Sequence, residues 1–111
     1  MLGEERGGRG GTSGLTWVVD PIDGTVNYLY EVGVYAVSVA VVTGDPTVEG
    51  AWTSVAGCVH NPVSGETWTA GRGVGSFLDG RRLRIGEPPS MDRALTGTGF
   101  GYFAGRRRTQ A

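Results

Sequence analysis

The run Tyr35–Val42 constrains the fold more than any other part of the chain. It is apolar except for Ser38 and is rich in valine, a β-branched residue that favours strands. Because successive side chains of a strand point to opposite faces, the run divides into two sets. These are Tyr35, Val37, Val39 and Val41 on one face, and Ala36, Ser38, Ala40 and Val42 on the other. We expect both faces to be buried, the smaller one against a helix or another sheet.

Turn residues divide much of the remaining chain into short segments. The sequence has 21 glycines in 111 residues, roughly three times the usual share of ~7%. Without a collagen-like period, these glycines indicate turns, bulges or flexible backbone. After a break at Gly44–Pro46, the pattern predicts an antiparallel meander with turns at 61–65, 71–75 and 79–80. Its expected strands are Val48–Trp52, Val55–His60, Glu66–Ala70, Ser76–Leu78 and Arg82–Ile85.

The segments that flank the meander are less regular. Residues 6–15 are rich in glycine and poor in apolar side chains, which is typical of a mobile loop. Trp17–Val19 predicts a strand that ends at Asp20, since a residue before proline favours extended geometry. A turn at Asp23–Thr25 leads into an expected short helix over Val26–Glu31. The last expected elements are a short helical segment capped at 88–90 and ending at Leu95, and a strand or glycine-rich turn over Thr96–Phe100.

Composition and charge exclude several classes of protein. A formal net charge of −1 is too small to attract a polyanion, so nucleic acid is not the expected partner. No apolar run approaches the ~18–20 residues that span a bilayer, and the N-terminus does not resemble a signal peptide. Cys58 has no second cysteine with which to form a disulfide or a cysteine-based zinc site. We therefore expect a soluble, cytoplasmic protein of about one domain, with no membrane partner.

The segment Asp20–Thr25 holds the residues best suited to chemistry. Its two carboxylates, Asp20 and Asp23, are three residues apart, and a proline and a glycine shape the backbone around them. Mg²⁺ binds oxygen ligands and often uses one or two carboxylates together with water and a substrate phosphate. Free N–H groups at the start of a helix can also bind an anion. Spacing alone leaves two alternatives open: a metal and phosphate site, or an Asp20 that ends a strand and an Asp23 that caps a helix.

A longer pattern distinguishes these alternatives. Its segments are Gly3–Glu5, Trp17–Tyr28, Tyr35–Ala40, Gly57–Pro62, Glu66–Ala70, Gly73–Phe77 and Asp79–Leu83. Together, and in this order, they resemble the inositol monophosphatase family over most of residues 3–103. The sequence Asp-Pro-Ile-Asp-Gly-Thr after a strand led by tryptophan is a specific signal of that family.

The resemblance implies a layered α+β fold of the sugar-phosphatase type. This chain would hold mainly the antiparallel β-sheet and one short helix. Residues 1–5 would end a metal-ligand-bearing element, residues 16–103 would form a partial domain, and residues 104–111 would be a basic tail or the start of a helix. The family's N-terminal helices and C-terminal domain are expected to be missing, because Met1 comes just before Glu4 and Glu5, and no tryptophan is followed by the aspartate of the family's Trp-Asp motif.

The resemblance also implies a set of magnesium ligands. Glu5 and Asp20 would bind the first Mg²⁺, with the backbone carbonyl of Ile22 as a further ligand. Asp20 and Asp23 would bind the second ion. These ligands are oxygen atoms, which is the donor type that Mg²⁺ prefers.

Phosphate binding and catalysis would fall to neighbouring groups. Asp23, Gly24 and Thr25 would contact the substrate, the latter two through backbone N–H groups. The Thr25 hydroxyl and Glu5 would orient the attacking water and are the expected catalytic residues. Metal ions lower the pKa of bound water and stabilise the leaving alkoxide, so no nucleophilic serine or cysteine is required.

The implied activity is Mg²⁺-dependent hydrolysis of a small phosphate monoester by two or three metal ions. The branch that the motif resembles most acts on inositol 1-phosphate and yields myo-inositol and phosphate. Relatives acting on histidinol phosphate, fructose 1,6-bisphosphate or phosphoadenosine phosphate stay open, as does a truncated, non-catalytic fragment that binds metal or a partner. A third hypothesis is RNA contact through the arginines of residues 6–14 and 106–108. An uncovered small-residue face would favour a homodimer or aggregation.

Three other signals have ordinary explanations. Gly71–Ser76 resembles a dinucleotide-binding loop, but no helix is expected to follow it, so a β-turn or bulge is predicted. His60 is expected to form a strand-end hydrogen bond rather than to bind metal. Cys58 is expected to be a small buried apolar residue.

Overall fold

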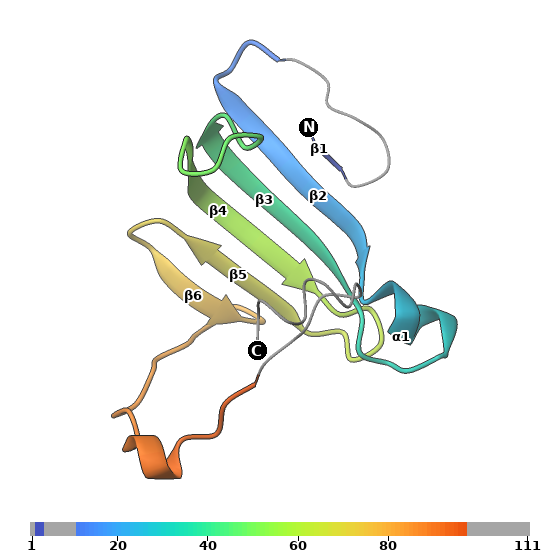
Figure 1. Cartoon of the computed structure of the whole chain (residues 1–111), viewed down its shortest axis with the longest axis vertical. Helices are drawn as coiled ribbons and strands as arrows, with labels where there is room; N and C mark the ends of the chain where they lie inside the picture. The colour runs from blue at the N-terminus through green and yellow to red at the C-terminus, as the bar shows by residue number, and fades with distance from the viewer. Residues whose placement is uncertain (1, 4–10, 98–111) are drawn as a thin grey trace, which may run out of the picture.

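The computed structural model describes residues 2–3 and 11–97, which form one seven-stranded sheet (Figure 1). The strands lie side by side in the order in which they occur in the sequence. They are β1 (Leu2–Gly3), β2 (Leu15–Asp23), β3 (Ala36–Gly44), β4 (Trp52–His60), β5 (Thr67–Gly71), β6 (Gly75–Leu78) and β7 (Arg81–Arg82). β1 is parallel to β2, and every later pair is antiparallel. The expected antiparallel meander is therefore confirmed.

The connection between β3 and β4 corrects one expectation. The sequence predicts separate strands over Val48–Trp52 and Val55–His60. The second is part of β4, whereas the first is a turn except for Trp52, which begins β4. The backbone N–H of Asp45 donates to the Ala51 carbonyl at 3.0 Å, and the N–H of Ala51 donates to the Val48 carbonyl at 3.1 Å. These backbone groups are used inside a closed turn, so they cannot form a strand ladder.

Several element boundaries also differ from expectation. β2 continues to Asp23 instead of ending at Asp20, because pairing with β3 resumes after an irregularity between these residues. The short helix α1 spans Thr25–Leu29 and lies at one end of the sheet (Figure 1). The strand expected over Arg82–Ile85 is reduced to β7, and the expected helical segment near Leu95 is a single 3₁₀ turn, η1 (Met91–Arg93).

Burial shows that the described residues form a single layer. Val42 is the one fully buried hydrophobic residue among them, at 1% exposure. The expectation that both faces of Tyr35–Val42 are buried is wrong for the described residues, where the rest of the run is only half-buried. The physical reason is that α1 sits at the end of the sheet and covers neither face along its length (Figure 1). None of the helices in the described part of the chain has the length and apolar character required to cross a membrane.

Some expectations lie outside the described residues. They concern Glu5, most of the expected loop 6–15, the end of the segment Thr96–Phe100, and the tail 104–111. Within residues 1–5, Leu2 and Gly3 form β1, and the following glutamates lie beyond the described part.

Candidate metal and phosphate site

Asp20 and Asp23 lie on the same face of the sheet because β2 contains a bulge between them. Asp20 pairs with Ser38 and Asp23 pairs with Ala36, so three steps along β2 match two steps along β3. In a regular strand, side chains three residues apart point to opposite faces. The extra residue of the bulge restores a common face. The two carboxylates therefore stand on the side of the sheet that carries Ala36 and Ser38, with Asp20 half-buried and Asp23 exposed.

Local hydrogen bonds fix the backbone of residues 20–25, the corner between β2 and α1. One carboxylate oxygen of Asp20, Oδ1, accepts a hydrogen bond from the backbone N–H of Ile22 at 3.1 Å. The hydroxyl of Thr25 donates to the Ile22 carbonyl oxygen at 3.0 Å. A carbonyl oxygen has two lone pairs, so the Ile22 carbonyl can accept this bond and still meet a cation. The Thr25 oxygen, having used its proton, has lone pairs with which to accept a hydrogen bond from water.

Gly24 makes the tight turn between β2 and α1. Its backbone is left-handed, with φ 88° and ψ 40°, and it occupies the N-cap position of α1. A Cβ atom at this position would stand 3.0 Å from the Val34 carbonyl oxygen. Both observations require glycine here. They also resolve the alternative that Asp23 caps the helix: the N-cap is Gly24, so the Asp23 carboxylate is not committed to that role.

The start of α1 is a weaker anion site than a long helix would provide. α1 has five residues, or about 1.4 turns, so few peptide dipoles are aligned in it. Any attraction for a phosphate would therefore come from the individual N–H groups of Gly24 and Thr25.

Glu5, the remaining expected ligand, lies outside the described residues. Gly3, two residues before it, ends β1 and pairs with Val19, the residue directly before Asp20. The described residues contain no group of three His, Cys, Asp or Glu side chains that could by itself hold a metal ion. The structure thus brings together five of the six expected residues: Asp20, Ile22, Asp23, Gly24 and Thr25.

Two asparagines beside this corner were not singled out from the sequence. A cavity of about 300 Å³ is lined by Asp23 together with Asn27, Asn61 and Trp68. Nδ2 of Asn27 donates to the Val34 carbonyl at 2.7 Å, and Nδ2 of Asn61 donates to the Gly33 carbonyl at 3.2 Å. Asn27 belongs to the motif after Gly24, but no sequence signal links Asn61 to a residue 28 positions away.

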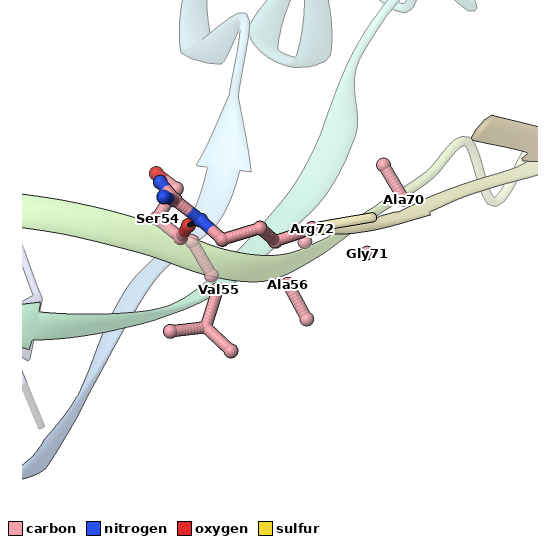
Figure 2. A pocket seen from close by; sticks show the side chains of 8 residues that line it. Ser54, Val55, Ala56, Ala70, Gly71 and Arg72 are labelled. Carbon is pink, nitrogen blue, oxygen red and sulfur yellow. Dashed lines mark hydrogen bonds between the residues drawn. The ribbon is translucent and has the colours of Figure 1, made fainter. Parts of the chain in front are cut away.

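A second hollow lies elsewhere on the sheet and has different chemistry. This cavity, of about 450 Å³, is lined by Ala40 of β3, by mostly small residues of β4 and β5, and by Arg72. Figure 2 shows the Arg72 side chain reaching toward Ser54, and its Nε donates to the Ser54 carbonyl at 3.0 Å. No carboxylate lines this cavity, so it does not share the metal-binding character of the corner.

The glycine-rich segment Gly71–Ser76, His60 and Cys58 were expected to have structural rather than catalytic roles. Gly71 and Gly75 flank the hairpin between β5 and β6, so the glycine-rich segment is a turn. Nδ1 of His60 forms a hydrogen bond with the Thr67 hydroxyl at 2.9 Å, as predicted for a strand end. Cys58 is half-buried rather than buried, because its face of the sheet is uncovered within the described residues.

Comparison with known proteins identifies the family. The model of the inositol monophosphatase family matches residues 1–111. The chain belongs to the inositol monophosphatase family. Among its relatives is an inositol-1-monophosphatase of Rhizobium meliloti, 42% identical over 100 residues, which cover 89% of this chain and 35% of the relative. A protein of Pseudomonas aeruginosa named Nus factor SuhB is 40% identical over 105 residues, which cover 92% of this chain and 36% of that protein.

Solved structures support the same assignment. The crystal structure of the extragenic suppressor protein SuhB from Bartonella henselae matches with a TM-score of 0.66 and 38% identity. The match covers 78% of this chain and 32% of that one. The expected fold, a mainly antiparallel part of the layered α+β inositol monophosphatase architecture, is therefore confirmed. The chain spans about a third of the length of the relatives that it matches.

Proposed function

We propose that the chain carries the metal- and phosphate-binding corner of a Mg²⁺-dependent phosphomonoesterase. The observation that carries this proposal is the bulge in β2, which sets Asp20 and Asp23 on one face beside the Gly24 turn. The donor set fits magnesium: two carboxylates and the Ile22 carbonyl are hard oxygen ligands. Glu5 is proposed as the fourth ligand, because it follows the strand that pairs beside Asp20.

Each residue of the corner has a proposed task. Asp20 would hold both ions, Glu5 and the Ile22 carbonyl would complete the first site, and Asp23 would complete the second. Bound Mg²⁺ would acidify a water molecule and neutralise charge on the phosphate. The Thr25 hydroxyl donates to the Ile22 carbonyl, so its oxygen is oriented to accept a hydrogen bond from the attacking water, which Glu5 would also orient. The N–H groups of Gly24 and Thr25 hold the phosphate, and Asp23 also contacts the substrate.

Inositol 1-phosphate is the proposed substrate. Membership of the family and the name of the Rhizobium meliloti relative support this choice. Histidinol phosphate, fructose 1,6-bisphosphate and phosphoadenosine phosphate are the competing substrates, and they share the phosphate monoester that the corner would bind. Release of inorganic phosphate from each of the four compounds, measured side by side, ranks them directly.

The test of the proposed function uses Asp23→Asn, which keeps the size of the side chain but removes its charge. We expect the chain to release phosphate from inositol 1-phosphate only when Mg²⁺ is added, and the variant to lose at least about 100-fold in rate, since even residues that only support metal ligands often contribute 10- to 100-fold. Asp92→Asn, an exposed change in η1, is the matched control and should leave the rate unchanged. Equal rates in the Asp23 variant and the control would refute the assignment.

The main alternative is a non-catalytic fragment that binds metal or a partner. It is supported by the share of the family's length that the chain spans and by the name Nus factor given to one relative. Mn²⁺ binding without phosphate release at any Mg²⁺ concentration would favour this alternative. Retention on RNA that disappears when the arginines of residues 6–14 and 106–108 are replaced would favour a nucleic-acid partner.

A further inference from the structure

The segment Gly33–Val34, which leads from α1 toward β3, is contacted on one side by the candidate site. Gly24 approaches so closely that a Cβ atom there would stand 3.0 Å from the Val34 carbonyl oxygen. Nδ2 of Asn27, on α1, donates to the same oxygen at 2.7 Å. Because the Gly24 turn and α1 both rest on one carbonyl group, a shift of Val34 would move the backbone that carries Asp23 and Thr25.

The turn between β4 and β5 contacts the same segment from another part of the sequence. Nδ2 of Asn61 donates to the Gly33 carbonyl at 3.2 Å. Val63, in the same turn, has its Cγ1 atom 3.0 Å from where a Cβ of Gly33 would stand. The segment is thus held by the Gly24 corner and by a turn that follows 28 residues after Gly33.

The orientation of the Asn61 amide is fixed by its own turn. Its Oδ1 accepts hydrogen bonds from the backbone N–H groups of Val63 at 2.8 Å and Ser64 at 3.1 Å. Rotating the amide by half a turn would set its NH₂ group against these two donors. Nδ2 therefore has to face Gly33, and Asn61 also lines the cavity that Asp23 lines.

We infer that Asn61 is a positioning residue for the proposed metal and phosphate site. Through Gly33 and Val34 it fixes the Gly24 turn, and thereby the aim of Asp23 and Thr25. Asn61 acts only through this backbone segment and is assigned no contact with metal or phosphate. The effect of Asn61 on metal and phosphate binding rests on the proposed function. The link from Asn61 to the Gly24 turn rests on the hydrogen bonds themselves.

Asn61→Asp is the decisive variant. It keeps the oxygen that accepts from Val63 and Ser64, but replaces the donor to Gly33 with an oxygen that repels the Gly33 carbonyl. The matched control is the reverse exchange, Asp45→Asn, in a similar turn, where Oδ1 of Asp45 accepts from the Thr47 N–H at 2.9 Å. This turn lies at the other end of β3, about 25–30 Å along the strand.

Two measurements on the 111-residue chain test the inference. In ¹⁵N NMR spectra without metal, Asn61→Asp should move the amide resonances of Gly24 and Thr25, and the control should not. In a Mn²⁺ titration followed by electron paramagnetic resonance, the variant should bind Mn²⁺ about 3- to 10-fold more weakly. Electrostatics alone predicts the opposite sign, because an added carboxylate attracts a cation.

The outcomes separate the inference from the proposed function. Unmoved Gly24 and Thr25 resonances, or Mn²⁺ affinity that is unchanged or raised, would overturn the positioning role. If the unaltered chain binds no Mn²⁺, the proposed function fails, and the amide resonances alone decide whether Asn61 positions the turn. Asn61→Ser, whose hydroxyl can still accept within the turn but is too short to reach Gly33, repeats the test if the aspartate variant does not fold.

Discussion

At the scale of single residues, Gly24 is a position in the candidate site that requires glycine. A left-handed backbone costs a residue with a Cβ roughly 1–2 kcal/mol, and here the Cβ would also press on the Val34 carbonyl. Gly24→Ala should therefore lower the free energy of unfolding by about 2 kcal/mol and weaken Mn²⁺ binding. Urea denaturation followed by tryptophan fluorescence, with a Mn²⁺ titration, measures both effects.

Gly50→Ala provides the control for this prediction. Gly50 is also left-handed, at φ 76°, but no atom lies within 4 Å of where its Cβ would stand. Its substitution should cost only the conformational part and leave Mn²⁺ binding unchanged. If Gly24→Ala and Gly50→Ala lower the free energy of unfolding equally and neither weakens Mn²⁺ binding, the close approach at Gly24 does not affect the candidate site.

Asp45 should make stability depend on pH in the acid range. Hydrogen bonds from the hydroxyl and the backbone N–H of Thr47 hold the pKa of the Asp45 carboxyl below its ordinary value of 3.8. The unfolded chain therefore binds more protons in this range, so the stabilisation is complete above the unfolded pKa and is lost as the pH falls through the lowered folded one. The difference in melting temperature between the unaltered chain and Asp45→Asn should be constant above about pH 5 and shrink below about pH 4. A difference that grows on acidification would contradict this account.

At the scale of the elements, β3 holds the structure together and β2 shapes the site. β3 lies between β2 and β4 and carries Val42, the one fully buried hydrophobic residue of the described chain. The bulge in β2 lets Asp20 and Asp23 share a face although their spacing in a regular strand would separate them. Stability and site geometry thus reside in neighbouring strands.

Val42→Ala should remove most of the stabilisation that the buried Val42 side chain contributes to the sheet. The loss of two methyl-sized groups from a fully buried position is expected to lower the free energy of unfolding by about 2 kcal/mol. Val74→Ala, at a position 58% exposed, should change it by less than about 0.5 kcal/mol. Thermal denaturation followed by circular dichroism compares the two. Similar melting temperatures would show that the sheet has no localised core.

At the scale of the whole molecule, the described sheet exposes large apolar side chains to solvent. Trp17 is 52% exposed and Leu15 is 46% exposed, although both lie in β2 in the interior of the sheet order. Uncovered apolar area of this kind favours association. We expect the isolated chain to form homodimers or larger species as its concentration rises, which sedimentation velocity over a concentration series would detect. A single monomeric species with a cooperative melting transition would contradict the expectation.

The sequence was sufficient to predict the order of most elements. Valine-rich runs separated by glycine turns predicted the meander because strand pairing between neighbours is a local property. The sequence-based prediction failed for the strand expected over Val48–Trp52, most of which forms a turn. The backbone hydrogen bonds of Asp45 and Ala51 close this turn and outweigh the strand propensity of its residues. Burial also failed, because burial depends on what covers a strand and not on the strand's own side chains.

For the candidate site, the sequence by itself determined which oxygen donors are present and the place of the turn. The Asp-Pro-Ile-Asp-Gly-Thr segment fixes which oxygen atoms are available and where the chain must be left-handed. Only the tertiary structure decided that the two carboxylates share a face, since that depends on how β2 registers against β3. It alone also decided that Asn61 contacts Gly33. That contact joins residues far apart in the chain, and a local sequence pattern cannot encode it. Only the pairing of β3 with β4 brings the two residues together.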